Sequence, residues 1–308
     1  MNKKQLPLLA AAFTLALLTG CSGAKQASES HIETIGDSIS EGITQTIGQT
    51  VVNLEQAVQN EASDWKDRAR ADSISEELAA SQKAEASAEL SLTNAVGEIE
   101  VKPVTGDQVI VHATIWGADK SSHRDDLQKI MDEAELSIDV RGSKLKVNVH
   151  PQDQPRTDLW SWAQKKIGYS DFSIDYVVEV PESVDTFQIQ SSVGEVRLTG
   201  VSGTFDIDTD VGAISLEQAV IKGRSVFESQ TGGIWLDVNE LDPSASVTAK
   251  TEVGSLNATL PASLDCDLTV DTELGAISGA AQGTSRLGQG GPEVALRTSV
   301  GAISIKQK

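Results

Sequence analysis

The chain has 308 residues, of which 39% are hydrophobic, and its 45 acidic and 25 basic residues give a formal net charge of −20. This charge argues against nucleic-acid binding and against broad electrostatic adhesion to anionic lipids or wall polymers. The chain contains two cysteines, Cys21 and Cys266, which are too few for a disulfide framework.

The first 20 residues have the organisation of a secretion signal. Lys3 and Lys4 precede an apolar run from Leu6 to Leu18, which is too short for an ordinary membrane span. The sequence Leu18-Thr19-Gly20-Cys21 closes the run and resembles a bacterial lipobox, in which the cysteine is acylated. We therefore expect a signal peptide over residues 1–20 and a lipid anchor on Cys21, which would hold the protein at the extracytoplasmic face of a cell membrane.

Residues 21–88 form a tether of different composition, rich in Ser, Ala, Gln and Glu. Apolar residues recur there at helical spacing, at Ile35, Ile39, Ile43, Ile47, Val51, Leu54 and Val58. Three glycines interrupt this pattern, and each lowers helix stability by about 1 kcal/mol relative to alanine. We therefore expect a partly helical stalk whose apolar stripe needs a partner, which could be the membrane, the exposed end of the following domain or another copy.

Residues 89–308 are predicted to form a single all-β domain, with insertions at about residues 116–170. Residues 107–115 have the pattern of a strand, residues 124–134 that of a short helix, and residues 136–149 that of a hairpin. Trp160 and Trp162 follow on a loop or short helix beside Lys165 and Lys166. The segment 172–181 then resumes the strand pattern.

A twelve-residue phrase recurs seven times in this domain, with a glycine between two short alternating apolar runs. The copies are LSLTNAVGEIEV, FQIQSSVGEVRL, FDIDTDVGAISL, SVFESQTGGIWL, VTAKTEVGSLNA, LTVDTELGAISG and VALRTSVGAISI. Such repetition is typical of a solenoid, in which each copy buries its apolar face by stacking on its neighbours. We therefore predict a parallel β-solenoid with coils of about 20 residues, and either a two-sheet β-roll or a three-sheet β-helix fits this length.

The columns of the repeat predict which side chains face inward when the coils stack in chain order. One buried column is Val196, Ile214, Ile234, Leu256, Ile277 and Ile303, and an outward column is Arg197, Ser215, Trp235, Asn257, Ser278 and Ser304. The glycine of each phrase marks a corner, where it either adopts a conformation closed to other residues or lets a neighbouring coil approach closely.

Three features together resemble the bacterial "putative adhesin" domain family. They are the phrase from Asn94 to Val101, the strand from Tyr176 to Pro181 that ends in Val-Pro, and the serial V-G-x-I-x-L coils. The resemblance covers about residues 89–308. It implies an extracytoplasmic, repetitive β domain, with some relatives associated with cell-envelope stress systems, and it implies no catalytic residues.

Aromatic residues on the outside of the domain are the candidate ligand-binding residues. Trp235 should project outward near Ser215, in the same column as Arg197, where a sugar ring or a partner side chain could stack on it. Trp160 and Trp162 could form a second contact surface with glycans or membrane. The alternative for each tryptophan is a structural one, in which it packs its own loop onto the domain.

Asp206, Asp208 and Asp210 alternate on one side of a predicted strand, and Glu228 should lie one coil beyond Asp208. Carboxylate oxygens in this arrangement could hold Ca²⁺, whereas a solvated acidic face is the simpler interpretation. We expect no other cofactor.

Enzymatic function has little support, because the sequence contains no nucleophile elbow, phosphate loop or metal-ligand spacing of its four histidines. The expected function is that of a lipid-anchored, adhesin-like scaffold that binds an envelope polysaccharide or a partner protein. A membrane-tethered accessory of envelope stress signalling and a polysaccharide-active enzyme are the alternatives. The sequence leaves the ligand and the oligomeric state open.

Overall fold

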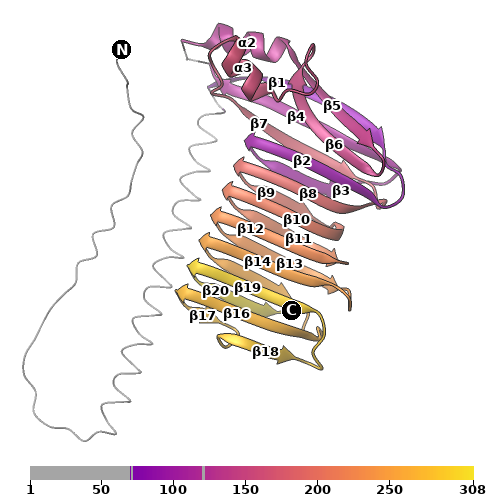
Figure 1. The fold of residues 1–308 in the computed structure, drawn as a ribbon, viewed down its shortest axis with the longest axis vertical. Coiled ribbons are helices and arrows are strands. Elements are labelled where there is room, and N and C mark those ends of the chain that lie inside the picture. Colours follow the sequence, from indigo (N-terminus) through magenta and orange to yellow (C-terminus); the bar gives the residue numbers. More distant parts are fainter. Residues whose placement is uncertain (1–69, 71, 120–121) are drawn as a thin grey trace, which may run out of the picture. The chain divides into compact units, whose positions relative to one another are not determined.

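The computed structural model describes residues 70, 72–119 and 122–308, which contain twenty strands and two short helices (Figure 1). The prediction of an all-β fold is confirmed, and most of the strand pairings are parallel. The strands form one continuous hydrogen-bonded network. It divides into two sheets of ten strands, which are linked where Ser202 and Gly203 of β10 pair with Val220 and Ile221 of β11.

The first sheet, which we call sheet 1, begins with two antiparallel pairings and is parallel from β7 onward. Its strands in spatial order are β1 (Ser73–Lys83), β4 (Gln108–Ala118), β7 (Ser173–Val180), β3 (Ile99–Pro103), β9 (Val196–Thr199), β11 (Ile214–Ile221), β13 (Ile234–Leu241), β15 (Leu256–Leu260), β20 (Ile303–Gln307) and β17 (Ile277–Ser278).

The second sheet, sheet 2, is parallel except at its two outermost pairings. Its strands in spatial order are β5 (Ala134–Arg141), β6 (Lys144–Pro151), β2 (Ala88–Val96), β8 (Val184–Val193), β10 (Ser202–Val211), β12 (Arg224–Thr231), β14 (Ser246–Val253), β19 (Glu293–Val300), β16 (Cys266–Leu274) and β18 (Gly283–Leu287).

Each of the seven sequence phrases contributes one strand to each sheet, and we call such a pair a repeat. The pairs are β2–β3, β8–β9, β10–β11, β12–β13, β14–β15, β16–β17 and β19–β20. The chain passes from sheet 2 to sheet 1 at the glycine of each phrase. Of the alternatives of two and three strands per repeat, the described residues show two.

The corner glycines combine both properties that the sequence suggested. Gly194 and Gly212 have φ values of +144° and +155°, which residues with a Cβ rarely adopt. A Cβ on Gly212 would lie 1.9 Å from the carbonyl oxygen of Gly194 in the neighbouring repeat. The amide of Gly212 in turn donates a hydrogen bond to the carbonyl of Thr231 in the next repeat, at 2.9 Å. The corners therefore stack as a continuous column of glycine backbone.

The core lies between the two sheets and contains the predicted buried column, of which Ile277 is only partly buried. Ile214 and Ile234 are fully buried and lie side by side, in register, on the neighbouring strands β11 and β13. Phe187, Phe205 and Phe227 stack along the core of sheet 2, with ring centroids 5.2 Å and 5.9 Å apart. Because each repeat buries this surface only against its neighbours, the repeats stabilise one another.

Two expectations are corrected by the strand order. The last two repeats exchange places, because β19 pairs with both β14 and β16, so that the C-terminal repeat lies inside and the β16–β17 repeat lies at the end. The predicted tether also ends earlier than residue 88, because Ser73–Lys83 form β1. This segment has low intrinsic strand propensity, but eleven aligned residue pairs with β4 supply backbone hydrogen bonds along its whole length.

The insertion contains the helix and the hairpin that the sequence predicts. Helix α2 spans Arg124–Asp132 and β5 and β6 form the antiparallel hairpin. The segment with the two tryptophans is the short helix α3 (Leu159–Lys166), which begins with the side chain of Asp158 accepting a hydrogen bond from the amide of Ser161 at 2.8 Å.

Candidate functional site

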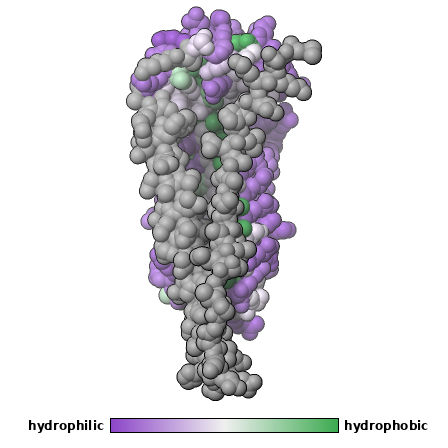
Figure 2. All heavy atoms as spheres, turned by 90° about the vertical axis from the view of Figure 1, so that its left-hand side faces the viewer, coloured by the Kyte–Doolittle hydropathy of each residue, from purple (hydrophilic) through white to green (hydrophobic). Residues whose placement is uncertain are grey.

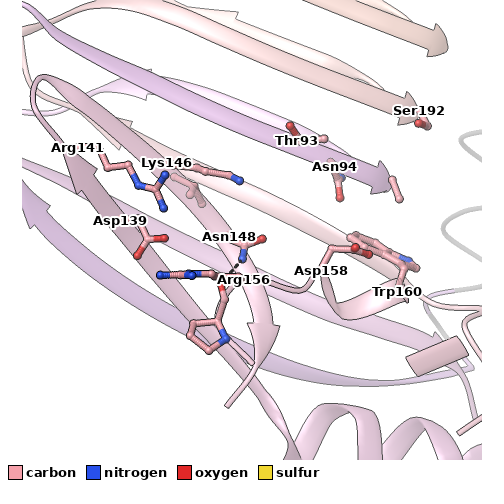
Figure 3. Close-up of a pocket in the computed structure, with 13 residues that line it drawn as sticks. Thr93, Asn94, Asp139, Arg141, Lys146, Asn148, Arg156, Asp158, Trp160 and Ser192 are labelled. Carbon is pink, nitrogen blue, oxygen red and sulfur yellow. Dashed lines mark hydrogen bonds between the residues drawn. The ribbon is translucent and has the colours of Figure 1, made fainter. Parts of the chain in front are cut away.

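A groove of about 520 Å³ lies where the β5–β6 hairpin, the end of β2 and the start of α3 meet (Figure 3). Its walls come from segments that are distant in the sequence. The lining residues are Thr93, Asn94, Ala95, Asp139, Arg141, Lys146, Val147, Asn148, Pro155, Arg156, Asp158, Trp160 and Ser192. Their side chains converge on the groove from several directions (Figure 3).

The hairpin positions the polar wall of this groove through strand alternation. Asp139 and Arg141 share one face of β5, and Lys146 and Asn148 share one face of β6. The side-chain nitrogen Nδ2 of Asn148 also donates a hydrogen bond to the carbonyl of Pro155 at 3.2 Å, which holds the loop with Arg156 against the hairpin. The groove is therefore built on paired strands and on a loop that is hydrogen-bonded to them.

The electrostatic character of the groove differs from that of the whole chain. Arg141, Lys146 and Arg156 are exposed and form no ion pair within the described part of the chain. Two carboxylates, those of Asp139 and Asp158, also line the groove. Three cations against two carboxylates give a locally positive site on a chain with a net charge of −20.

Asn94 supplies a polar group that is buried and not fully satisfied. Its side chain is 1% exposed, and its amide nitrogen donates to the carbonyl of Ile174 at 2.9 Å. Its Oδ1 atom has no hydrogen-bond partner among the described residues. A buried acceptor without a donor is costly to the stability of the fold, and this oxygen is closed off from solvent.

Trp160 forms a rigid apolar wall of the groove. Its ring stacks on Phe172 with centroids 5.2 Å apart and an interplanar angle of 5°, and its Nε1 donates to the carbonyl of Phe172 at 3.2 Å. These two contacts hold the indole in one orientation while it remains partly exposed. An indole beside amides and charged groups is a suitable surface for a saccharide ring.

The structure separates the other predicted ligand-binding residues from this groove. Trp162 is 8% exposed and belongs to the hydrophobic core, where it packs α3 onto the domain. Trp235 lies half-buried on the outer face of β13, aligned with Ser215 and Asn257 as expected. Arg197 lies in the same column, but its guanidinium forms ion pairs with Glu195 and Glu217.

The acidic residues proposed for Ca²⁺ do lie close together on the outer face of sheet 2. Asp208 aligns with Glu228, and its pKa is raised above the ordinary value by burial and then by the charges of Glu228, Asp210 and Asp206. Asp210 accepts a hydrogen bond from Gln230 at 2.7 Å. Within residues 70, 72–119 and 122–308, no group of three or more His, Cys, Asp or Glu side chains is arranged to hold a metal ion. Calcium binding stays a prediction.

Cys21, the signal peptide and the apolar stripe of the tether lie outside the described residues. In the part of the chain that the structure describes, no helix is long and apolar enough to cross a membrane. Cys266 is buried, as the sequence suggested, and burial followed by the charges of Asp267 and Asp265 raises the pKa of its thiol to about 11.

Sequence reasoning identified Trp160 but missed the residues that surround it. Asn94 belongs to a repeat phrase, where its position predicts an inward side chain and nothing more. The basic residues 141, 144, 146 and 156 occur within 16 positions of an acidic chain. That local excess of positive charge is the signal that could have indicated the groove.

No family model matches the chain, and no curated protein matches it in sequence. Among solved structures, the chain is similar to a "putative cell adhesion protein" from Clostridium sporogenes, with 14% identity and a TM-score of 0.40 over 76% of this chain and 100% of the other. It is also similar to a "putative adhesin" from Bacteroides fragilis, with 12% identity and a TM-score of 0.35 over 75% and 97% of the two chains. A "putative lipid binding protein" from Parabacteroides distasonis has 10% identity and a TM-score of 0.25 over 77% and 98%.

Proposed function

We propose that this protein is an adhesin-like binding protein, and that its groove binds an acidic saccharide of the cell envelope. The observation that carries the proposal is that Arg141, Lys146 and Arg156 line the same groove as the indole of Trp160. Guanidinium groups bind carboxylates with two parallel hydrogen bonds, and an indole packs against the apolar face of a sugar ring.

The strong negative charge of the chain limits how such a ligand is recognised. The net negative charge of the chain repels a polyanion at long range. Binding therefore depends on short-range contacts inside the groove. We therefore expect recognition of a short stretch of saccharide, with affinity that falls as the salt concentration rises. Broad adhesion to anionic polymers would not fit this charge distribution.

The wider proposal is that a β-solenoid presents this groove at the extracytoplasmic face of a membrane. The repeat pattern and the stacked glycine corners support a solenoid, and the lipobox-like sequence before Cys21 supports a lipid anchor. Labelling of cells with a clickable palmitate analogue should mark the protein, and the Cys21→Ser variant should lose the label. A variant that keeps the label would contradict the anchor.

The groove is tested by calorimetric titration with an oligogalacturonide and with a neutral oligogalactoside of the same length. We expect saturable binding of the acidic saccharide only. Each charge-assisted hydrogen bond contributes about 1.5–3 kcal/mol, so Arg141→Gln with Arg156→Gln should weaken binding at least tenfold.

Lys165→Gln with Lys166→Gln is the matched control, because it removes two exposed cations from α3 that do not line the groove. This variant should bind like the native chain. Equal binding of the neutral saccharide, an equal loss in the control, or no binding of either saccharide would overturn the proposal.

A further inference from the structure

A row of mostly apolar side chains, which we call the valine stripe, runs along the outside of the molecule. Each of its members is the residue before a corner glycine. In stacking order its members are Val96, Val193, Val211, Thr231, Val253, Val300 and Leu274. Four of them are 45–52% exposed, and in the described residues only Val140 is a comparably exposed large hydrophobic residue elsewhere. Figure 2 shows hydrophobic side chains following one another along this face. Such a concentration marks a surface that is normally covered.

The length of the stripe matches that of the apolar segment in the tether. Neighbouring strands lie about 4.8 Å apart, so the six steps from Val96 to Leu274 span about 29 Å. The apolar residues from Ile35 to Val58 cover 24 positions, and the 23 steps between the first and the last would span about 35 Å in a helix, at about 1.5 Å per residue. The segment is therefore long enough, as a helix, to cover the whole stripe.

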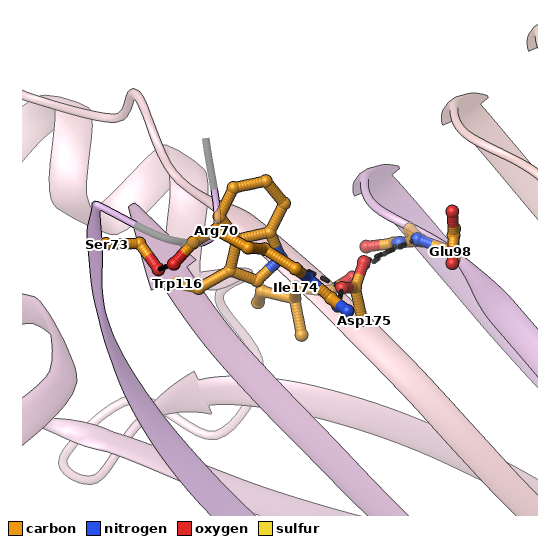
Figure 4. A network of polar contacts seen from close by, with 7 residues as sticks. Arg70, Ser73, Glu98, Trp116, Ile174 and Asp175 are labelled. Carbon is orange, nitrogen blue, oxygen red and sulfur yellow. Dashed lines mark hydrogen bonds and ion pairs between the residues drawn. The ribbon is translucent and has the colours of Figure 1, made fainter. Parts of the chain in front are cut away.

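The point at which the described chain begins supports the same pairing. Arg70 forms an ion pair with Asp175 and packs over the ring of Trp116, 5.4 Å from its centroid (Figure 4). Asp175 is buried and also accepts hydrogen bonds from Trp116 Nε1 at 2.9 Å and from the amide of Glu98 at 2.8 Å. Glu98 follows the corner glycine Gly97, so residue 70 is held beside the first member of the stripe.

Because Arg70 is held at this place, the residues that precede it stay close to the valine stripe. Val58 is 12 positions before Arg70, a distance that gives a flexible connection an effective concentration in the millimolar range. We infer that residues 35–58 of the same chain dock with their apolar face on the valine stripe. The docking goes beyond the proposed function, since it involves neither the groove nor a saccharide.

Apolar burial alone drives this docking. The stripe is flanked by Asp210, Glu252 and Glu273, and the segment carries Glu41 and Glu55, so charges on the two surfaces do not attract each other. Docking should therefore persist at high salt, because salt screens like charges and leaves the apolar contact intact.

Amide hydrogen exchange of the full-length acylated chain in detergent tests the inference. In the native chain we expect residues 35–58 to exchange at least tenfold more slowly than in the variant Val193→Thr, Val211→Thr and Val253→Thr. Threonine is tolerated in this column, because Thr231 occupies it in the native chain. The control variant is Asp210→Asn with Glu252→Gln, which alters the neighbouring outward positions on two of the same strands and should keep the protection.

Protection must also be independent of protein concentration and of added lipid vesicles. Protection that appears only at high concentration would show that a second copy covers the stripe, and protection that requires vesicles would assign the segment to the membrane. Either result would overturn the inference. Fast exchange in the native chain, or equal protection in the valine variant, would do the same.

Discussion

Replacing Gly212 by alanine should destabilise the protein more than the loss of one flexible residue explains. The backbone at Gly212 has φ +155°, and holding a residue with a Cβ in such a region costs about 1–3 kcal/mol. The new Cβ would also lie 1.9 Å from the carbonyl oxygen of Gly194, where ordinary contacts begin at 3.4 Å. Moving two repeats apart to relieve this overlap costs about another 1–3 kcal/mol.

Gly106→Ala separates the two contributions to this cost. Gly106 also has a positive φ, +120°, but a Cβ built there would meet nothing within 4 Å. We therefore expect Gly106→Ala to lower the free energy of unfolding only by the cost of the backbone conformation. The difference between the two variants should then be about 1–3 kcal/mol, the cost of the steric contact alone.

Urea unfolding followed by tryptophan fluorescence measures this difference. With an m-value of about 2 kcal/mol/M, the Gly212→Ala midpoint should lie about 1 M below that of Gly106→Ala. If the two variants unfold at the same urea concentration, close backbone approach at the corners is not what selects glycine there.

Three further predictions concern side chains of the core and of the outer face. Thr251→Val should cost about 1–2 kcal/mol in urea unfolding, because the buried hydroxyl donates to the carbonyl of Gly232 at 2.9 Å. Asp208→Asn should stabilise the protein at pH 7, since burial and the charge of Glu228 raise the pKa of this carboxyl and so disfavour its ionised form. The native chain should recover this loss as the pH falls through that raised pKa, so the advantage of Asp208→Asn should shrink in acid. The thiol of Cys266 should resist iodoacetamide at pH 8 until urea unfolds the chain, because it is buried and its pKa is about 11.

Each of these predictions has a result that would contradict it. Thr248 lies on the outward side of the same strand, so Thr248→Val should lower stability less than Thr251→Val. Equal effects would show that the buried hydroxyl does not contribute. An advantage of Asp208→Asn that is constant with pH would mean that its charge is not the cause. Rapid alkylation of Cys266 in the native chain would show that the end repeat opens readily.

Much of the fold follows from the sequence because its signals are local. Alternation around Ile214 and Leu216 predicts a strand with one buried face, and the glycine before it predicts a corner, whatever else the chain does. The columns of buried residues follow from the same alignment. The short helix α2 and the β5–β6 hairpin were predictable for the same reason, since their signals lie within a few residues of one another.

The candidate site was only partly predictable, because it depends on contacts between distant segments. Trp160 stood out in the sequence, but its neighbours in the groove come from residues 93–95 and 139–148 as well as from its own loop. Trp162, two positions further on, turns into the core because successive positions on a helix point in different directions. Spacing alone did not distinguish these two tryptophans.

The sequence by itself determined the repeat, its corners and the side chains that each strand buries. Only the tertiary structure decided that β19 lies between β14 and β16, that Ser73–Lys83 extend sheet 1, and that a basic groove forms at the hairpin. The physical reason is that the repeats present nearly identical apolar faces to one another. Local pattern then specifies what stacks, whereas the order of stacking depends on the connections and on the packing of the whole chain.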